Sequence, residues 1–212
     1  MSERCLIAVP MKNPLHSKSR LAPVLEPHRR IKLVHYLYNK KFLMCRQLAE
    51  HVEFQPLIVT DCPAITEHAR NNGISAHLQL KPAGDDINAG LNLAVTEAFS
   101  VACANNFQMF CMLAADIVAP RVEEILSLLA SPSDISICAS SDRGTNALRL
   151  RIPNTFQFKF GPNSADAHAA EGKKRGMTVS FMQLESLSHD VDDAASLAFA
   201  MKKYRELWDV IL

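Results

Sequence analysis

The chain has 212 residues, of which 48% are hydrophobic and 21% are charged, and its formal net charge is +1. These proportions are ordinary for a globular protein and exclude disordered and fibrous classes. The near-neutral charge provides no overall field, and the single tryptophan gives no obvious platform for stacked bases, so we expect neither a nucleic-acid nor a membrane partner.

Six cysteines are scattered along the chain without a C-x-x-C pair, and four of them lie in apolar runs. Thiols in such runs usually act as small hydrophobic side chains, so we expect reduced cysteines. The first apolar run is too short for a signal peptide, and no stretch approaches the length of a membrane span. The sequence therefore predicts a cytoplasmic protein.

Short apolar runs alternate with longer stretches of helical periodicity. In chain order, the predicted elements are a strand at Cys5–Met11, a helix at 27–50, a strand at 56–60, a helix from 63 to 72, a strand at 74–80, a helix at 87–104, a strand at 107–115, a helix at 120–129, strands at 134–140 and from 147, a helix at Ser164–Lys174, a strand at 177–184 and a helix from 193. Strands that alternate with helices indicate right-handed β-α-β units. We expect one α/β domain over residues 1–212 with a mainly parallel, doubly wound, Rossmann-like sheet.

The loop after the first strand, residues 12–21, is basic. It carries Lys12, Lys18 and Arg20 directly before the long helix. Clustered cations suit a polyphosphate, because lysine acts as a point charge and arginine can donate two hydrogen bonds to one phosphate. The loop lacks the glycine-rich pattern of a P-loop, which excludes that motif, and a solvated basic loop is the alternative.

Acidic residues follow two later segments. Asp116 comes directly after the predicted strand 107–115, and Asp190 and Asp192 are two positions apart. Residues two apart in an extended stretch point to one side, and neighbouring carboxylates repel unless a cation joins them. Oxygen ligands favour Mg²⁺ or Mn²⁺, which also bind phosphate oxygens. The alternative is that Asp116 and Asp193 only cap the helices that follow.

Two small polar segments complete the candidate site. Residues 142–146 (D-R-G-T-N) lead into a strand of alternating apolar residues, and common turn residues there allow either a plain turn or a binding turn. We interpret them as a binding turn. In the segment 160–164 (F-G-P-N-S), Gly161 allows backbone N–H groups to approach an anion, and Ser164 opens a helix whose N-terminus suits an anion.

Seven motifs in this order match one family. They are Pro10-Met11-Lys12, Lys18-Ser19-Arg20-Leu21, Gly90-Leu91-Asn92, Ala115-Asp116, Gly144-Thr145-Asn146-Ala147-Leu148, Phe160-Gly161-Pro162-x-Ser164 with His168, and Asp190-Val191-Asp192. The chain thereby resembles the 2-phospho-L-lactate guanylyltransferase family, which serves the biosynthesis of the deazaflavin coenzyme F-420. The match runs from about Pro10 to Leu197, and its specific parts are G-T-N-A-L and F-G-P-x-S.

The resemblance implies a GT-A-like nucleotidyltransferase. Such an enzyme joins GMP from GTP to the phosphate of phospholactate, phosphoenolpyruvate or 3-phosphoglycerate and releases pyrophosphate, and the family suggests a homodimer. By motif, the resemblance implies Asp116, Asp190 and Asp192 as metal ligands, Thr145, Gly161 and Ser164 as acid-binding residues, Lys12, Lys18 and Arg20 as catalytic phosphate contacts, and Gly90 and Asn92 as nucleotide-binding residues.

The sequence departs from the family at Ala165, where an aromatic residue is usual, and around Asp116 and Asp193. We expect Ala165 to enlarge the acid pocket, and His168 either to contact a ligand or to lie on the helix surface without a role. Two other functions stay open. A sugar-nucleotide glycosyltransferase would also use D-x-D but needs less cationic charge, and a silent nucleotide-binding or dimerising module is disfavoured because an acid cluster without its metal is costly.

Overall fold

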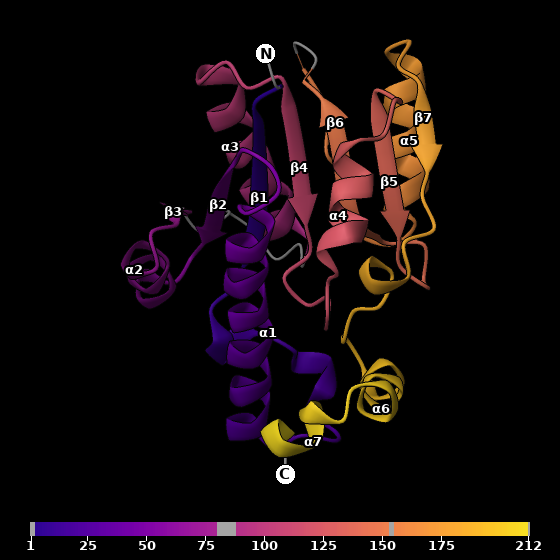
Figure 1. Cartoon of the computed structure of the whole chain (residues 1–212). Helices are drawn as coiled ribbons and strands as arrows, with labels where there is room; N and C mark the ends of the chain where they lie inside the picture. Colours follow the sequence, from indigo (N-terminus) through magenta and orange to yellow (C-terminus); the bar gives the residue numbers. More distant parts are fainter. Residues whose placement is uncertain (1–2, 80–87, 153–154, 212) are drawn as a thin grey trace.

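The computed structural model describes residues 3–79, 88–152 and 155–211 of the chain. At its centre lies a seven-stranded sheet (Figure 1). The strands are β1 (Cys5–Met11), β2 (Phe54–Thr60), β3 (Ser75–Leu78), β4 (Met109–Leu113), β5 (Ile135–Ala139), β6 (Thr145–Arg151) and β7 (Val179–Phe181). They are arranged in the order β3-β2-β1-β4-β6-β5-β7, and among them β6 alone runs antiparallel to its neighbours. The prediction of a mainly parallel α/β sheet is confirmed.

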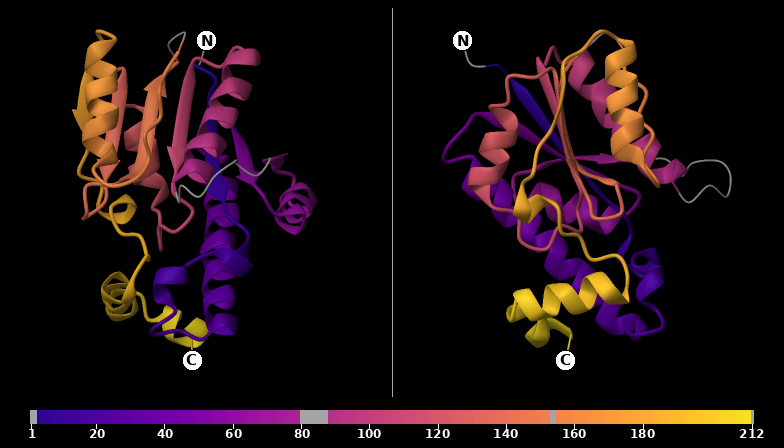
Figure 2. Two further views of the ribbon diagram at one scale, coloured as in Figure 1. Left: turned by 180° about the vertical axis from the view of Figure 1, so that it is seen from behind. Right: turned by 90° about the vertical axis from the view of Figure 1, so that its right-hand side faces the viewer.

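Helices cover both faces of the sheet (Figure 2). The helices α1 (Pro27–Leu48), α2 (Pro63–Asn71) and α4 (Val122–Leu129) pack on one face, and α3 (Ala89–Ala104) and α5 (Ser164–Lys174) pack on the other. Alternate residues of β1 serve the two layers, since Ile7 packs toward α1 and Leu6 toward α3. A central parallel strand covered on both faces reads as one continuous apolar run, which explains why β1 was predictable.

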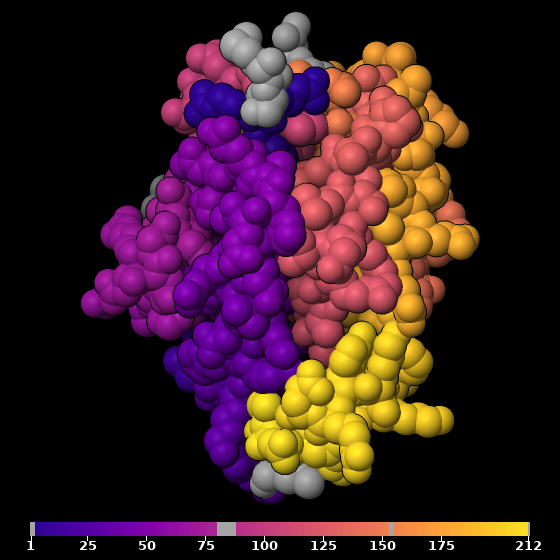
Figure 3. Space-filling view, viewed as in Figure 1, coloured from indigo at the N-terminus to yellow at the C-terminus, as the bar shows by residue number. Residues whose placement is uncertain are grey.

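Beyond the carboxyl ends of β1 and β4 lie α6 (Ala194–Lys203) and α7 (Glu206–Ile211), which pack beside the first turns of α1 (Figures 1 and 3). Short 3-10 helices span Pro14–His16, Ser19–Leu21 and Glu185–Leu187. Asp193 caps α6, because its carboxylate accepts from the Ser196 N–H at 2.8 Å. The cap predicted for Asp193 is therefore confirmed, whereas the residue before α4 is Arg121 and Asp116 caps no helix. In the described part of the chain, every helix is too short or too polar to cross a membrane.

Candidate functional site

A cavity of about 590 Å³ opens beyond the carboxyl ends of β1, β2 and β4. Ligands bind at this edge in open α/β sheets, because the loops after the strands meet there. The predicted site residues that line it are Lys12, Lys18, Arg20, Gly90, Asp116, Thr145, Asp190 and Asp192. The other three, Asn92, Gly161 and Ser164, lie outside the lining. Segments far apart in the sequence thus supply cations and carboxylates to one cavity.

Two backbone hydrogen bonds bring the acidic loops together. The Val191 N–H donates to the Asp116 carbonyl, and the Val118 N–H donates to the His189 carbonyl, both at 3.3 Å. Val191 itself is fully buried, so Asp190 and Asp192 on either side of it face the cavity. The prediction that these two carboxylates share one side, near Asp116, is confirmed.

The Lys18 ammonium forms ion pairs with two of the aspartates. Its ammonium lies 2.6 Å from an Asp116 carboxylate oxygen and 3.4 Å from one of Asp192, and the Arg20 guanidinium donates to the other Asp192 oxygen at 2.8 Å. Lys18 has a left-handed backbone with φ 55°, which is uncommon for a residue other than glycine. Such outliers persist where the surroundings hold them, often at functional sites. The backbone at this point directs the ammonium into the cavity.

The charges in the cavity affect one another. Burial disfavours ionisation of Asp116, but the adjacent Lys18 ammonium outweighs it, so the pKa of Asp116 is lowered. Burial and the Asp116 charge raise the pKa of Asp190 to about 6, although Asn146 donates to its carboxylate at 3.1 Å. Burial and a neighbouring acid therefore both oppose the ionisation of Asp190.

These carboxylates suit a hard cation by chemistry. Their oxygens face one cavity, and oxygen ligands are those that Mg²⁺ prefers. Within residues 3–79, 88–152 and 155–211, however, no three acidic, histidine or cysteine side chains are already gathered as a metal-ligand set. The ammonium of Lys18 lies between Asp116 and Asp192 instead. The residues fit magnesium if Lys18 moves away from Asp116, and the metal assignment stays a prediction.

Several residues in or beside the cavity were missed from the sequence, among them His16, Asp61 and Lys41. His16 and Asp61 line the cavity, and Asp61 accepts a hydrogen bond from the Asn13 N–H at 2.8 Å, which anchors the basic loop. Lys41 is fully buried in α1, and its ammonium donates to the Ile117 carbonyl beside Asp116. Asp61 follows a strand as Asp116 does, so the same signal was available for it, whereas a lysine in a helix gives no sign of burial.

On the opposite wall, Gly90 lines the cavity, and its carbonyl accepts from the Gln79 side chain at 2.8 Å. Asn92 instead pairs with the backbone of Phe160, since its oxygen accepts from the Phe160 N–H at 2.7 Å and its amide donates to the Phe160 carbonyl at 3.1 Å. Asn92 therefore fastens α3 to the segment before Gly161. A nucleotide contact by Asn92 stays a prediction.

The predicted acid-binding residues form a connected group. The hydroxyls of Thr145 and Ser164 are 2.9 Å apart, and Thr145 also bonds the ring of His168 at 3.1 Å. His168 is fully buried, so of the two expectations for this histidine, a position on the helix surface without a role is wrong. Gly161 has φ 139°, and a Cβ there would lie 2.9 Å from the Asn88 amide nitrogen. Only glycine fits that position without strain.

The turn before β6 is partly different from the prediction. Asp142 and Gly144 form a local turn, in which the Asp142 carboxylate accepts from the Gly144 N–H at 3.1 Å, while Arg143 pairs with Asp166 on the surface. These residues do not line the cavity. Thr145 and the residue after it belong to β6 and do line it. The interpretation of 142–146 as one binding turn is therefore wrong for its first three residues.

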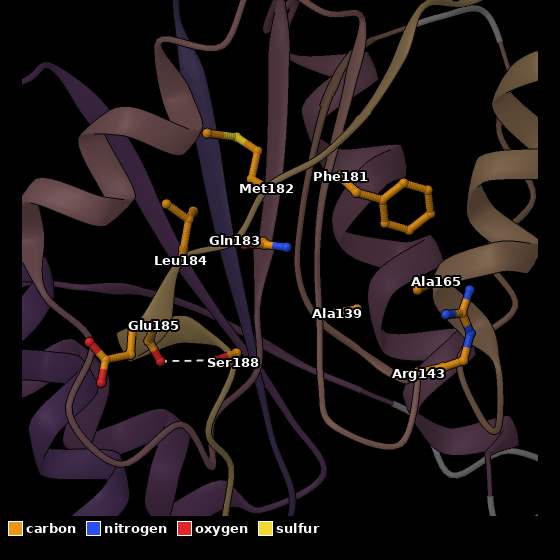
Figure 4. A pocket seen from close by; sticks show the side chains of 9 residues that line it. All are labelled: Ala139, Arg143, Ala165, Phe181, Met182, Gln183, Leu184, Glu185 and Ser188. Carbon is orange, nitrogen blue, oxygen red and sulfur yellow. Dashed lines mark hydrogen bonds between the residues drawn. The ribbon is translucent and has the colours of Figure 1, made fainter.

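A second hollow of about 650 Å³ lies beside the carboxyl ends of β5 and β7 (Figure 4). Ala165 borders this hollow together with Arg143 and Phe181. It does not border the cavity that the three aspartates line. The expectation that Ala165 enlarges the pocket for the substrate acid stays a prediction, because the neighbouring Ser164 also lies outside the lining of that cavity.

Comparisons with known proteins identify the family and the fold. The family model described as "Guanylyl transferase CofC like" matches residues 5–202. A phosphoenolpyruvate guanylyltransferase from Chloroflexus aggregans is 32% identical over 90% of this chain and 94% of its own length. A 2-phospho-L-lactate guanylyltransferase from Methanothermobacter thermautotrophicus is 31% identical over 89% of this chain and 80% of its own. The fold is shared with a nucleotide-diphospho-sugar transferase structure from Desulfovibrio desulfuricans, which is 16% identical, has a TM-score of 0.73, and covers 100% of this chain and 97% of its own.

Proposed function

The chain belongs to the CofC-like guanylyltransferase family, and we propose from this premise that it transfers GMP from GTP to the phosphate of a small phosphorylated acid and releases pyrophosphate. The observation that carries the proposal is the cavity that Lys12, Lys18 and Arg20 line together with the three aspartates. Both reactants are anionic, so the barrier to their reaction is largely charge repulsion and alignment.

The cations of the cavity would bind the triphosphate. Lys12 is exposed to the cavity, and among the described residues it makes no ion pair, so its ammonium is available for a phosphate oxygen. Arg20 is held at one end by Asp192, while most of its side chain is exposed. Lys18 would exchange its carboxylate contacts for phosphate oxygens. Together these three residues would stabilise the charge that develops on the leaving pyrophosphate.

Asp116, Asp190 and Asp192 would hold magnesium, with manganese as a substitute. The bound ion would neutralise phosphate charge and favour attack at the α-phosphorus. No protein base is needed, because the attacking phosphate is already ionised at neutral pH.

The acceptor would be a three-carbon phosphorylated acid held by Thr145, Gly161 and Ser164. The named substrates of the two relatives, phosphoenolpyruvate and 2-phospho-L-lactate, define this class, and 3-phosphoglycerate is its third member. The pathway would be coenzyme F-420 biosynthesis. Six free cysteines suit a cytoplasmic location, and a homodimer is proposed on family membership alone, with sedimentation as its test.

The test is a panel of reactions. The protein with Mg²⁺ is incubated with each nucleoside triphosphate and each of the three acids, and products are identified by mass while pyrophosphate is measured. We expect pyrophosphate and a guanylylated acid only where GTP and an acid are both present. Pyrophosphate release that does not depend on an acid, or consumption of a nucleotide sugar without pyrophosphate, would refute the proposal and would favour a glycosyltransferase in the second case.

A further inference from the structure

A buried chain of hydrogen bonds lies behind Thr145. The Lys159 N–H donates to His168 Nε2 at 3.0 Å, His168 Nδ1 lies 3.1 Å from Thr145 Oγ1, and Thr145 Oγ1 lies 2.9 Å from Ser164 Oγ. All three side chains are buried, and Thr145 alone of them also lines the cavity. The chain thus runs from a backbone amide to the wall of the proposed site.

The backbone amide determines the tautomer of His168. A backbone N–H can only donate, so Nε2 must carry a lone pair, and a neutral ring then carries its proton on Nδ1 and donates it to Thr145. The ring stays neutral because it is packed against Phe156, Phe158 and Phe160, with the nearest ring centroid at 4.6 Å. This burial lowers the pKa of His168 to about 4.

The hydroxyl protons then have one consistent arrangement. Thr145 Oγ1 can accept two hydrogen bonds and donate one. It accepts one from His168, and among the described residues the Ser164 hydroxyl has Thr145 as its side-chain partner. Because an unmade bond of a buried donor is costly, the Ser164 proton belongs on the second lone pair of Thr145. The Thr145 proton is left to point into the cavity that Thr145 lines.

We propose that His168 is a positioning residue that makes the Thr145 hydroxyl a fixed hydrogen-bond donor to the carboxylate of the acceptor acid. The proposal rests on the proposed function. Thr145 Oγ1 bonds Ser164 and His168 of α5, whereas the Asn146 amide donates to Asp190, so these two neighbouring side chains are directed to different parts of the site. The phosphate of the acceptor must face the acids and cations, which leaves the carboxylate for Thr145. A donor-only hydroxyl favours an anionic oxygen over a neutral ester.

A matched pair of variants separates the two ring nitrogens. In His168→Gln, the side-chain amide reaches the position of Nε2, so it can still accept from Lys159 but cannot donate to Thr145. In His168→Asn, the amide nitrogen occupies the position of Nδ1, so the donor to Thr145 is kept and the contact with Lys159 is lost. Each variant loses one hydrogen bond of the same buried group, and the exposed His51→Gln serves as a control.

The readout is the preference of the enzyme for each of the three acids over its carboxylate methyl ester. We expect His168→Gln to raise the KM for the acid and to reduce this preference by about tenfold, the loss of one charge-assisted hydrogen bond. The KM for GTP is expected to stay within about twofold, since the proposal assigns this hydroxyl to the acceptor acid. His168→Asn should keep the preference, and in a Thr145→Val background His168→Gln should have no further effect. The proposal would be overturned if His168→Gln and His168→Asn had the same preference for the acid over its ester. It would also be overturned if the KM for the acid and the KM for GTP rose equally in His168→Gln.

Nitrogen NMR of the wild-type protein tests the same inference without relying on a variant's activity. The His168 resonances, assigned by their loss in either variant, should show the proton on Nδ1, whereas a proton on Nε2 would overturn the proposal. The two claims fail separately. A wild-type protein that makes no product with any acid refutes the proposed function, and an active wild type whose variants keep the full acid preference refutes only the role of His168.

Discussion

Lys18 is the single residue on which the charge balance of the site depends most. Its side chain is only 9% exposed, and its ammonium contacts two carboxylates that come from distant loops. Removing one partner of a buried ion pair leaves an uncompensated charge, which costs more than the pair contributes when intact. Lys18 therefore has two roles, the stability of the unliganded site and the binding of phosphate.

Lys18→Met tests both roles. We expect a loss of about 2 kcal/mol in the free energy of unfolding, below the range for a fully buried pair because both aspartates are partly exposed. We also expect kcat/KM for pyrophosphate release to fall by at least about tenfold. The control is Lys173→Met on the exposed side of α5. Urea denaturation and a pyrophosphate assay measure the effects, and equal results for the two variants would contradict this role.

His168 makes the stability dependent on pH. Its pKa is lowered to about 4 in the folded protein from an ordinary 6.5, so between these values the unfolded chain binds a proton that the folded protein does not. Its contribution to stability is fully present above pH 6.5 and is lost as the pH falls through 4. Asp190, with its raised pKa, has the opposite slope, but that slope cancels when two proteins that both contain Asp190 are compared.

On acidification from pH 6.5 toward 4, the wild type should therefore lose stability faster than His168→Asn. The expected difference in slope is up to about 1.4 kcal/mol per pH unit. Urea denaturation of both proteins at four pH values in this window measures it. Parallel stability curves would show that His168 is not held neutral by the fold.

At the scale of elements, the loops at the carboxyl edge of the sheet carry the site, and the sequence predicted this part well. Apolar runs located the strands, and polar residues within three positions of the strand ends, such as Lys12 and Asp116, line the cavity. The physical reason is that the carboxyl ends of parallel strands meet at one edge. Charge and position along the chain were enough to place these residues.

Sequence analysis did not predict the burial of polar residues whose hydrogen-bond partners are distant in the sequence. Thr145 was assigned to a turn because it is polar, yet it lies buried in β6 with bonds to Ser164 and His168. Lys41 is buried because the Ile117 carbonyl accepts from it. No local sequence pattern predicts such hydrogen-bonded pairs, since burial of a polar group depends on the element that packs against it.

A substitution at Gly161 tests the segment that supports the proposed binding site of the substrate acid. Gly161→Ala places a methyl group 2.9 Å from the Asn88 side chain at φ 139°, so we expect backbone strain together with a displaced cavity wall. Gly176→Ala is the control, because φ is also positive there, at 73°, and no atom lies within 4 Å of the added carbon. We expect Gly161→Ala to cost about 1–3 kcal/mol and to raise the KM for the acid, and Gly176→Ala to leave that KM unchanged. The same KM in both variants would show that the close approach at Gly161 has no function.

At the scale of the whole molecule, the segment that carries Asp190 and Asp192 is anchored by a hydrophobic cluster that lies outside the sheet. Val191 packs in one buried cluster with Leu33 of α1, Leu197 of α6 and Leu207 of α7. This cluster joins the end of the chain to its first long helix and fixes the segment that carries Asp190 and Asp192 (Figure 1). The C-terminal helices thus contribute to the site although they supply none of its lining residues.

Leu197→Ala should therefore affect both stability and activity. We expect a loss of about 2–4 kcal/mol from the cavity that it creates, together with a lower kcat/KM, because the support of Val191 is weakened. Leu43→Ala removes the same atoms from an exposed position of α1 and serves as the control. Thermal unfolding and the pyrophosphate assay give the two values. A destabilised Leu197→Ala whose kcat/KM at low temperature equals that of the wild type would show that α6 stabilises the fold without positioning the acids.

The most direct measurement compares acid-dependent pyrophosphate release from GTP by the wild type, Asp116→Asn and the distant Asp209→Asn while the concentration of Mg²⁺ is varied. If Asp116 faces a magnesium-bound triphosphate across from the cations, its amide variant should lose about a hundredfold in rate, while Asp209→Asn follows the wild-type curve. Magnesium-dependent release that is undiminished in Asp116→Asn would mean that the transfer takes place somewhere else on the molecule.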